Sequence, residues 1–186
     1  MTQAVSEDLK KAIEEVLEER ERTKQRKIAL VASKGTLDWA YPPLVLATTA
    51  AALGWEVGIF FTFYGLNILH KDRLKKLPVT AVGNPAMPGM QVLGGEVSPP
   101  AIMTILPGMV GFSGVMMKQI FNKNNISSIT SLMDTAIEAE VKLFPCSMTM
   151  AAFNIEAKDI IEGAQDPCGA TTFLDYAKDA DVIMFI

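Results

Sequence analysis

Residues 27–33 read KIALVAS, and residues 56–63 read EVGIFFTF. Each is a short apolar run, which is typical of a strand buried in a parallel sheet. Residues 37–53, between the two runs, are predicted to form a helix that Thr36 or Asp38 caps. A strand, a helix and a second strand of these lengths form one βαβ unit.

The same alternation continues along the rest of the chain. We expect further helices over residues 65–77, 117–124, 128–140, 156–163 and 169–178, and further strands over residues 141–145 and 181–186. Strands that alternate with helices in this way predict the α/β class with a parallel sheet. Because ligand sites in open sheets of this kind lie beyond the carboxyl ends of the strands, residues that follow strands are the first candidates for function.

Residues 1–26 differ from the rest of the chain, because Glu, Lys and Arg dominate them. A narrow apolar stripe runs through them at roughly helical spacing, formed by Val5, Leu9, Ile13, Val16 and Leu17. We therefore expect a charged N-terminal helix over residues 1–26, lying on the domain or on a neighbouring subunit. The α/β domain itself is expected over residues 27–186.

The composition excludes several classes of protein. Hydrophobic residues make up 49% of the 186 residues, which supplies a core and argues against general disorder. The net charge of −4 leaves no basic surplus for binding nucleic acid. Two cysteines and one histidine favour neither a disulfide framework nor a zinc site. No apolar signal segment is visible in residues 1–26, so we expect a cytoplasmic protein.

The middle of the chain, residues 78–114, is rich in Gly, Pro and Met, and Glu96 is its only charged residue. Residues 101–117 carry no acidic or basic side chain, but Pro and Gly interrupt them and they fall short of the roughly 20 residues of a spanning helix. We expect an apolar loop that covers a pocket or packs in an oligomer, with membrane contact as the alternative. The glycines form no phosphate-binding motif, and no cofactor is expected. A flavodoxin-type cofactor protein fits the fold class only by analogy.

The two cysteines are the principal candidates for chemistry. Cys146 follows the strand at 141–145, where backbone N–H groups at the start of the next element would favour its thiolate. The alternative is a small apolar core residue, a common fate of free cysteine. Cys168 also precedes a predicted helix, but its spacing from Cys146 matches no local redox motif. The sequence leaves open whether the two cysteines are neighbours.

Two polar residues that follow the second strand, Tyr64 and Asn67, are candidates to line a pocket, with simple packing as the alternative. His70 stands beside Lys71 on the predicted helix and has no metal or nucleophile partner nearby in sequence. We expect it to be a surface or half-buried histidine.

Three segments together resemble the DsrE/DsrF-like family: FTFYGLN at residues 61–67, the Met-rich middle, and CSMTM at residues 146–150. The resemblance covers residues 27–186, and the CSMTM segment is its most specific part. It implies a three-layer α/β/α sandwich over a mostly parallel five-stranded sheet, with residues 79–82 as the strand that apolar runs alone do not reveal. It also implies homo-oligomers, either trimers or hexamers.

The family's cysteine corresponds to Cys146, and Cys168 is carried over as a second catalytic residue. Tyr64, Asn67 and Met148 are then expected to form the pocket around the sulfur. The implied function is a sulfur carrier or sulfurtransferase that binds sulfane sulfur or thiosulfate on a cysteine and passes it to a TusA-like or rhodanese-like partner. Catalytic turnover and stoichiometric carriage both stay open, as do a non-catalytic scaffold and a membrane-associated subunit.

Overall fold

A parallel sheet organises the chain in the order β5-β2-β1-β6. Its strands are β1 (Lys27–Ala32), β2 (Glu56–Phe61), β5 (Lys142–Pro145) and β6 (Val182–Phe185). The structure is a computed structural model that describes residues 9–16, 19–20, 24–80, 90–92, 95–97, 114, 117, 119–121 and 123–186. The expected α/β class with a parallel sheet is confirmed, since every pairing in this sheet is parallel.

The expected count of five strands is wrong for the described residues, in which this sheet has four. Val79 and Thr80 join no strand, while residues 81 and 82 lie outside the described part. This segment is used differently: Val79 is buried, and the Pro78 carbonyl accepts a hydrogen bond from Leu37 N at 2.8 Å. Residues 78–80 therefore pack against the start of the helix that begins at Leu37, and they do not add a strand to the sheet.

The outer edge of β5 is partly covered by residues 165–168. Gln165 N donates to the Leu143 carbonyl at 2.8 Å, and Cys168 N donates to the Pro145 carbonyl at 3.0 Å. Pro167 lies between the two donors and has no N–H of its own, so it cannot donate a further backbone hydrogen bond to β5. The result is an isolated bridge between Cys146 and Cys168 rather than a strand.

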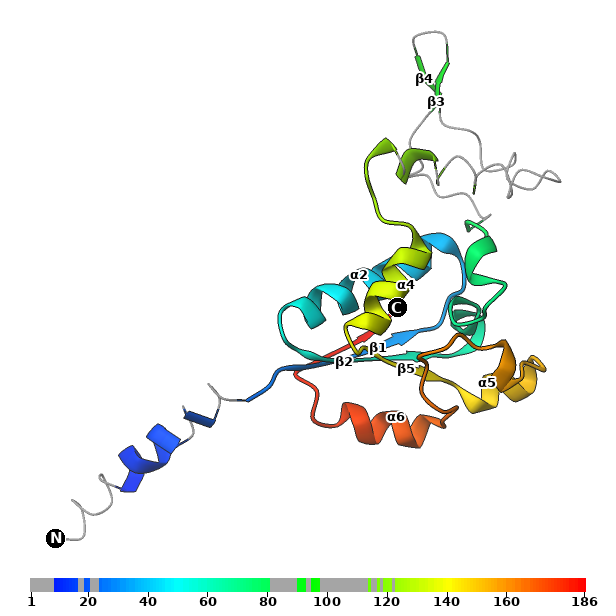
Figure 1. Ribbon diagram of the computed structural model, residues 1–186. Coiled ribbons are helices and arrows are strands. Elements are labelled where there is room, and N and C mark those ends of the chain that lie inside the picture. Colours follow the sequence, from blue (N-terminus) through cyan, green and yellow to red (C-terminus); the bar gives the residue numbers. More distant parts are fainter. Residues whose placement is uncertain are drawn as a thin grey trace.

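Helices cover both faces of the sheet. On one face lie α2 (Leu37–Ala52) and α4 (Ile129–Glu138), and on the other lies α6 (Ala170–Ala177), as Figure 1 shows. Alternate residues of each strand serve the two faces, because successive side chains of a strand point in opposite directions. The core on the α2 and α4 side takes Ile28 and Leu30 from β1, and the core on the α6 side takes Ala29.

The predicted boundaries of α2 and α4 differ from the observed ones by one or two residues. Thr36 is the N-cap residue of α2, but its side chain makes no capping bond and its hydroxyl lies 3.0 Å from that of Thr80. Ser128 does cap α4, because its hydroxyl accepts a hydrogen bond from Ser131 N at 3.1 Å.

Two predicted helices are shorter and tighter than expected. The segment expected over residues 65–77 forms two 3₁₀ helices, η1 (Phe63–Ile68) and η2 (Leu74–Lys76). The segment expected over residues 156–163 forms η4 (Ala157–Asp159). Long-range backbone contacts replace continuous helix here: His70 bridges Ile160, and Ile161 N donates to the Leu69 carbonyl at 2.9 Å.

The described chain contains three further short elements with defined bounds. A short helix, α5 (Ser147–Ala152), follows β5 directly. An antiparallel hairpin consists of β3 (Met90–Val92) and β4 (Gly95–Val97). Most of the apolar segment at 101–117 lies outside the described residues, and among those that are described no helix has the length and apolar character needed to cross a bilayer.

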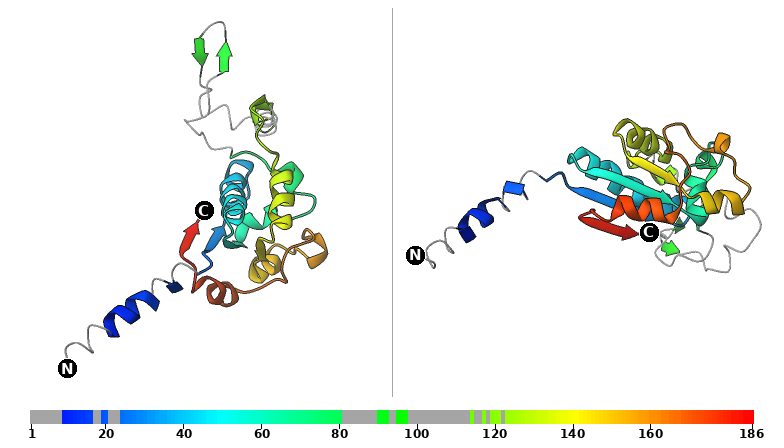
Figure 2. Two further views of the ribbon diagram at one scale, coloured as in Figure 1. Left: turned by 60° about the vertical axis from the view of Figure 1, so that its left-hand side comes forward. Right: turned by 90° about the horizontal axis from the view of Figure 1, so that it is seen from below.

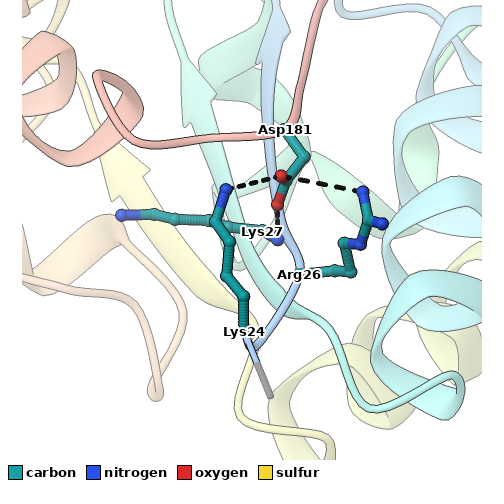
Figure 3. Close-up of polar contacts among 4 residues, drawn as sticks. All are labelled: Lys24, Arg26, Lys27 and Asp181. Carbon is teal, nitrogen blue, oxygen red and sulfur yellow. Dashed lines mark hydrogen bonds and ion pairs between the residues drawn. The ribbon is translucent and has the colours of Figure 1, made fainter. Parts of the chain in front are cut away.

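Asp181 ties the first strand to the last. Its carboxylate pairs with Lys24 Nζ at 2.8 Å, lies 3.8 Å from Arg26, and accepts a hydrogen bond from Lys27 N at 2.9 Å (Figure 3). These contacts lower the pKa of Asp181, the Lys24 side chain first. The preceding helical residues 9–16 are exposed and stand away from the sheet in both views of Figure 2.

Candidate functional site

The carboxyl ends of β1, β2 and β5 are joined by backbone hydrogen bonds. Thr62 N donates to the Ala32 carbonyl at 3.0 Å, and Gly65 N donates to the Ser33 carbonyl at 3.1 Å. On the other side of β2, Cys146 N donates to the Phe61 carbonyl at 3.0 Å. The residues that the sequence singled out after these strands therefore share one edge of the sheet.

Cys146 stands at the junction of β5 and α5, as the N-cap residue of that helix. Only 3% of the residue is exposed. It belongs to the apolar cluster on the α6 side of the sheet, together with Phe60, Phe144 and Phe173. The rings of Phe60 and Phe173 stack with their centroids 4.9 Å apart. One side of the thiol site is thus a packed aromatic wall.

Polar groups nevertheless favour the thiolate of Cys146. Burial raises the pKa of this thiol, but the hydroxyl and N–H of Thr149 oppose that effect. The hydroxyl of Thr62 and the N–H of Met148 add to the opposition, and the pKa lies below its ordinary value of 9.0. No lysine or arginine is among the causes, so neutral donors hold the charge.

Thr149 is held in place by the end of β2. Its hydroxyl accepts a hydrogen bond from Phe63 N at 3.0 Å and lies 3.3 Å from the hydroxyl of Thr62. Phe63 has a positive φ of 47°, a backbone conformation that a bulky side chain rarely adopts. The role of Thr149 was not predicted from the sequence, although its position three residues after an N-cap cysteine brings it back to the thiol by one helical turn.

Cys168 lies beside Cys146, although 22 positions separate them along the chain (168 − 146). The two residues form a parallel bridge, and Ser147 N donates to the Cys168 carbonyl at 3.0 Å. Both thiols are free. Burial raises the pKa of Cys168, and the nearby charge of Cys146 raises it further. The arrangement therefore places a thiolate-forming cysteine next to one that stays protonated at higher pH.

The three expected pocket residues are not brought together. Tyr64 and Asn67 line a pocket of about 660 Å³ beside the end of β1, which neither cysteine lines. Met148 is on α5 and is 65% exposed. Tyr64 connects the two regions, because its ring stacks on that of Phe153 just after α5 with centroids 5.7 Å apart.

The single histidine takes no part in either region. His70 Nδ1 accepts a hydrogen bond from Asp72 N at 3.2 Å, which makes it a local turn residue. Within the described residues, no three His, Cys, Asp or Glu side chains are arranged to hold a metal ion.

Comparison with known protein sequences gives three results. The sequence pattern of the DsrE/DsrF/DrsH-like family matches residues 24–185. The chain is 44% identical over 162 residues to "Sulfur carrier protein DsrE2" of Allochromatium vinosum, covering 87% of this chain and 99% of that protein. It is 30% identical over 169 residues to the uncharacterized protein YrkE of Bacillus subtilis, covering 89% of this chain and 99% of that one.

Among solved structures, the chain aligns with the crystal structure of the ychN protein from E. coli, with a TM-score of 0.49 and 10% sequence identity. The alignment covers 88% of this chain and 100% of that one.

Proposed function

The chain belongs to the DsrE/DsrF/DrsH-like family, and from that premise we propose that it carries sulfane sulfur on Cys146 and passes it to a thiol of a partner protein. The observation that carries the proposal is the set of neutral donors around Cys146, which lowers the pKa of a thiol that burial alone would raise. A thiolate is the form of cysteine that attacks sulfane sulfur. The name of the Allochromatium relative describes the same kind of role.

Loading is a nucleophilic substitution at sulfur. The Cys146 thiolate attacks the outer sulfur of a donor persulfide, a new S–S bond forms, and the donor's S–S bond breaks. The donor leaves as a thiolate that takes up a proton, and Cys146 becomes a persulfide. With thiosulfate the same attack on the terminal sulfur releases sulfite. No net oxidation or reduction occurs in either case.

Unloading reverses the roles. A partner's thiolate attacks the outer sulfur of the Cys146 persulfide, and Cys146 leaves as a thiolate that hydrogen bonds from Thr149 and Thr62 stabilise. The low pKa of the leaving group favours this step. The aromatic cluster of Phe60, Phe144 and Phe173 would shield the persulfide from water between the two steps.

We propose that Cys168 takes part in the same sulfur transfer. The bridge makes Cys168 a neighbour of Cys146, and its raised pKa makes it a poor competitor for the donor. We propose that loading occurs at Cys146 and that Cys168 is a second carrier. The Cys168 thiolate attacks the outer sulfur of the Cys146 persulfide, a new S–S bond forms at Cys168, the S–S bond at Cys146 breaks, and Cys146 leaves as a thiolate.

The surface near Cys146 suits a protein partner. Phe63, Tyr64, Met148 and Phe153 are exposed on η1, α5 and the residue after α5, and η1 and α5 contact each other. Exposed apolar side chains of this kind are typical of an interaction site. We propose a TusA-like or rhodanese-like protein as the partner, in the cytoplasm, with this chain acting as a homo-oligomer.

The burial of Cys146 also favours a second candidate, a non-catalytic scaffold in which the thiol is only a core side chain. The two candidates differ in one measurable property, because a packed and inert thiol takes up no sulfur.

The test is intact mass spectrometry of the native protein after incubation with polysulfide, thiosulfate or tetrathionate. We expect a mass gain of one or more sulfur atoms, or of a thiosulfonate with tetrathionate. Cys146→Ser should abolish the gain, and Cys168→Ser should retain it. A wild-type chain with reduced thiols and no adduct from any donor would establish the scaffold role instead. Retention of the adduct in Cys146→Ser would move the carrier role to Cys168.

A further inference from the structure

The pocket beside β1 is lined by neither cysteine and has the dimensions of a ligand site. Its volume of about 660 Å³ lies within the range of roughly 300–1,000 Å³ that is usual for small-molecule sites. Its walls come from the loop after β1, the first turn of α2, η1, and the segment from Asp72 to Thr80. It opens at the carboxyl end of β1, where open α/β sheets bind their ligands.

The lining of this pocket is cationic in a protein whose net charge is −4. Lys34, Arg73 and Lys76 line it, against the single carboxylate of Asp72. Arg73 donates to the side-chain oxygen of Asn67 at 2.7 Å, and the ammonium of Lys34 lies 3.2 Å from the centre of the Trp39 ring. Among the described residues, none of the three cations is paired with a carboxylate. Their positive charge is therefore not neutralised by an acidic side chain of the described residues.

The rest of the lining suits a flat, largely apolar body. Trp39, Tyr64, Leu77 and Pro78 supply aromatic and aliphatic surface, and Tyr64 is exposed. Aromatic side chains favour stacking on planar rings. The start of α2 contributes little to anion binding, because Leu37 N is already bonded to the Pro78 carbonyl. Side chains must therefore hold the charged end of any ligand.

The floor of the pocket is fixed by close packing of backbone on backbone. A Cβ atom on Gly35 would lie 1.9 Å from the Tyr64 carbonyl oxygen, and one on Gly65 would lie 2.1 Å from the Ala32 carbonyl oxygen. Only glycine permits such approaches. The opposite wall is tied to α2, because Thr80 donates to Asp38 through both its N–H, at 3.1 Å, and its hydroxyl, at 2.7 Å. The pocket is thus held open before a ligand arrives.

We propose that this pocket binds an aromatic phosphate monoester of about mononucleotide size, with the phosphate on Lys34, Arg73 and Lys76 and the ring against Trp39 and Tyr64. The pocket is a binding site distinct from the sulfur site, and its occupancy does not require either thiol. A planar ring alone would leave the three cations without a counter-ion. Inorganic phosphate alone would leave most of the apolar side chains of the pocket exposed to water.

Tryptophan fluorescence tests the proposal directly, because one of the two tryptophans lines the pocket and the other does not. In a Trp55→Phe background, Trp39 is the only reporter. We expect saturable quenching by adenosine 5′-monophosphate, with adenosine and inorganic phosphate each binding about tenfold or more weakly. Arg73→Gln should weaken binding of the monophosphate about tenfold, as loss of one charge-assisted contact does.

Two control variants test whether the effect is specific to the pocket. Lys71→Gln removes a nearby exposed cation that does not line the pocket, and it should bind the monophosphate as the parent does. Cys146→Ser should also bind normally. Absence of saturable quenching, equal weakening by Lys71→Gln and Arg73→Gln, or equal binding of inorganic phosphate and the monophosphate would each overturn the proposal.

Discussion

Cys146 and the pocket beside β1 share one edge of the sheet, but they are built to hold negative charge in opposite ways. Cys146 is buried among aromatic rings, and neutral hydroxyl and amide donors lower its pKa. The pocket is open, and Lys34, Arg73 and Lys76 line it. Neutral donors suit a charge that must form and disappear during a reaction, whereas fixed cations suit a charge that a ligand brings with it.

The comparison also explains why a cation beside Cys146 would be a disadvantage for a carrier. The nucleophilicity of a thiolate falls as its pKa falls, so a strongly stabilised thiolate loads slowly. At Cys146 burial opposes the hydrogen bonds, and the pKa is lowered less than the donors alone would lower it. Such a balance keeps the thiolate both populated and reactive.

The largest expected effect comes from a change that breaks both regions at once. Gly35→Ala forces a Cβ atom against the Tyr64 carbonyl, at the contact that joins the pocket floor to η1. We expect a loss of about 3 kcal/mol in the free energy of unfolding, measured by urea denaturation. Monophosphate binding and thiol reactivity should fall together, because η1 also carries Phe63, whose N–H positions Thr149.

Gly114→Ala is the matched control for that experiment, since no residue that the structure describes lies within 4 Å of the added atom. It should leave stability within about 0.5 kcal/mol of the parent. A Gly35→Ala protein as stable as this control would show that the two regions are not joined through Gly35.

A smaller effect is expected from a change that alters the Cys146 site and leaves the pocket intact. Thr149→Val removes a hydroxyl that favours the Cys146 thiolate, so the pKa of Cys146 should rise and its alkylation by iodoacetamide at pH 7 should slow about tenfold. In a Cys168→Ser background the rate should increase with pH as the thiolate forms. Its midpoint should lie below 9.0 in the parent and move upward in the variant.

Thr49→Val, on the exposed side of α2, provides the control for the loss of a threonine hydroxyl and should leave that midpoint unchanged. Monophosphate binding should be unaffected in both variants. An unchanged midpoint in Thr149→Val would mean that its hydroxyl does not stabilise the thiolate.

The smallest expected effect is that of salt, and it sharpens the contrast in charge. Raising the ionic strength from about 0.05 to 0.5 M shortens the screening length several-fold. Binding of the monophosphate should weaken about fivefold, because exposed cations hold it. Alkylation of Cys146 by the uncharged reagent should change less than about twofold. Equal sensitivity in the two measurements would contradict the assignment of neutral donors to Cys146.

The sequence predicted the parts of this fold that depend on local pattern. Apolar runs identified the four strands of the parallel sheet that the structure describes, and helical spacing identified α2, α4 and α6 to within a few residues. It failed where long-range backbone contacts decide the conformation. The two 3₁₀ helices after β2 replace one helix because Gly65 is bonded to the Ser33 carbonyl and His70 pairs with Ile160.

For the candidate site, too, the sequence predicted what depends on local pattern and not what depends on long-range contacts. The position of Cys146 follows from the strand before it, but its nearness to Cys168 depends on how residues 165–168 run along the edge of β5. No local spacing encodes that path. Two residues of the pocket, Tyr64 and Asn67, were predicted from their position after the second strand. Trp39 and Arg73 were not predicted, because the segments that carry them are distant in sequence and meet only in the folded chain.

Because β1 pairs with β6, this part of the sheet can form only after residues 182–185 have been synthesised on the ribosome. Lys27 and Asp181, which begin the β1–β6 contact, are 154 positions apart. At ordinary rates of translation, on the order of ten seconds pass between their synthesis. During that interval β1 can pair with β2 but has no partner on its other side, and a nascent chain with an open strand edge invites pairing with its neighbours on the same messenger RNA.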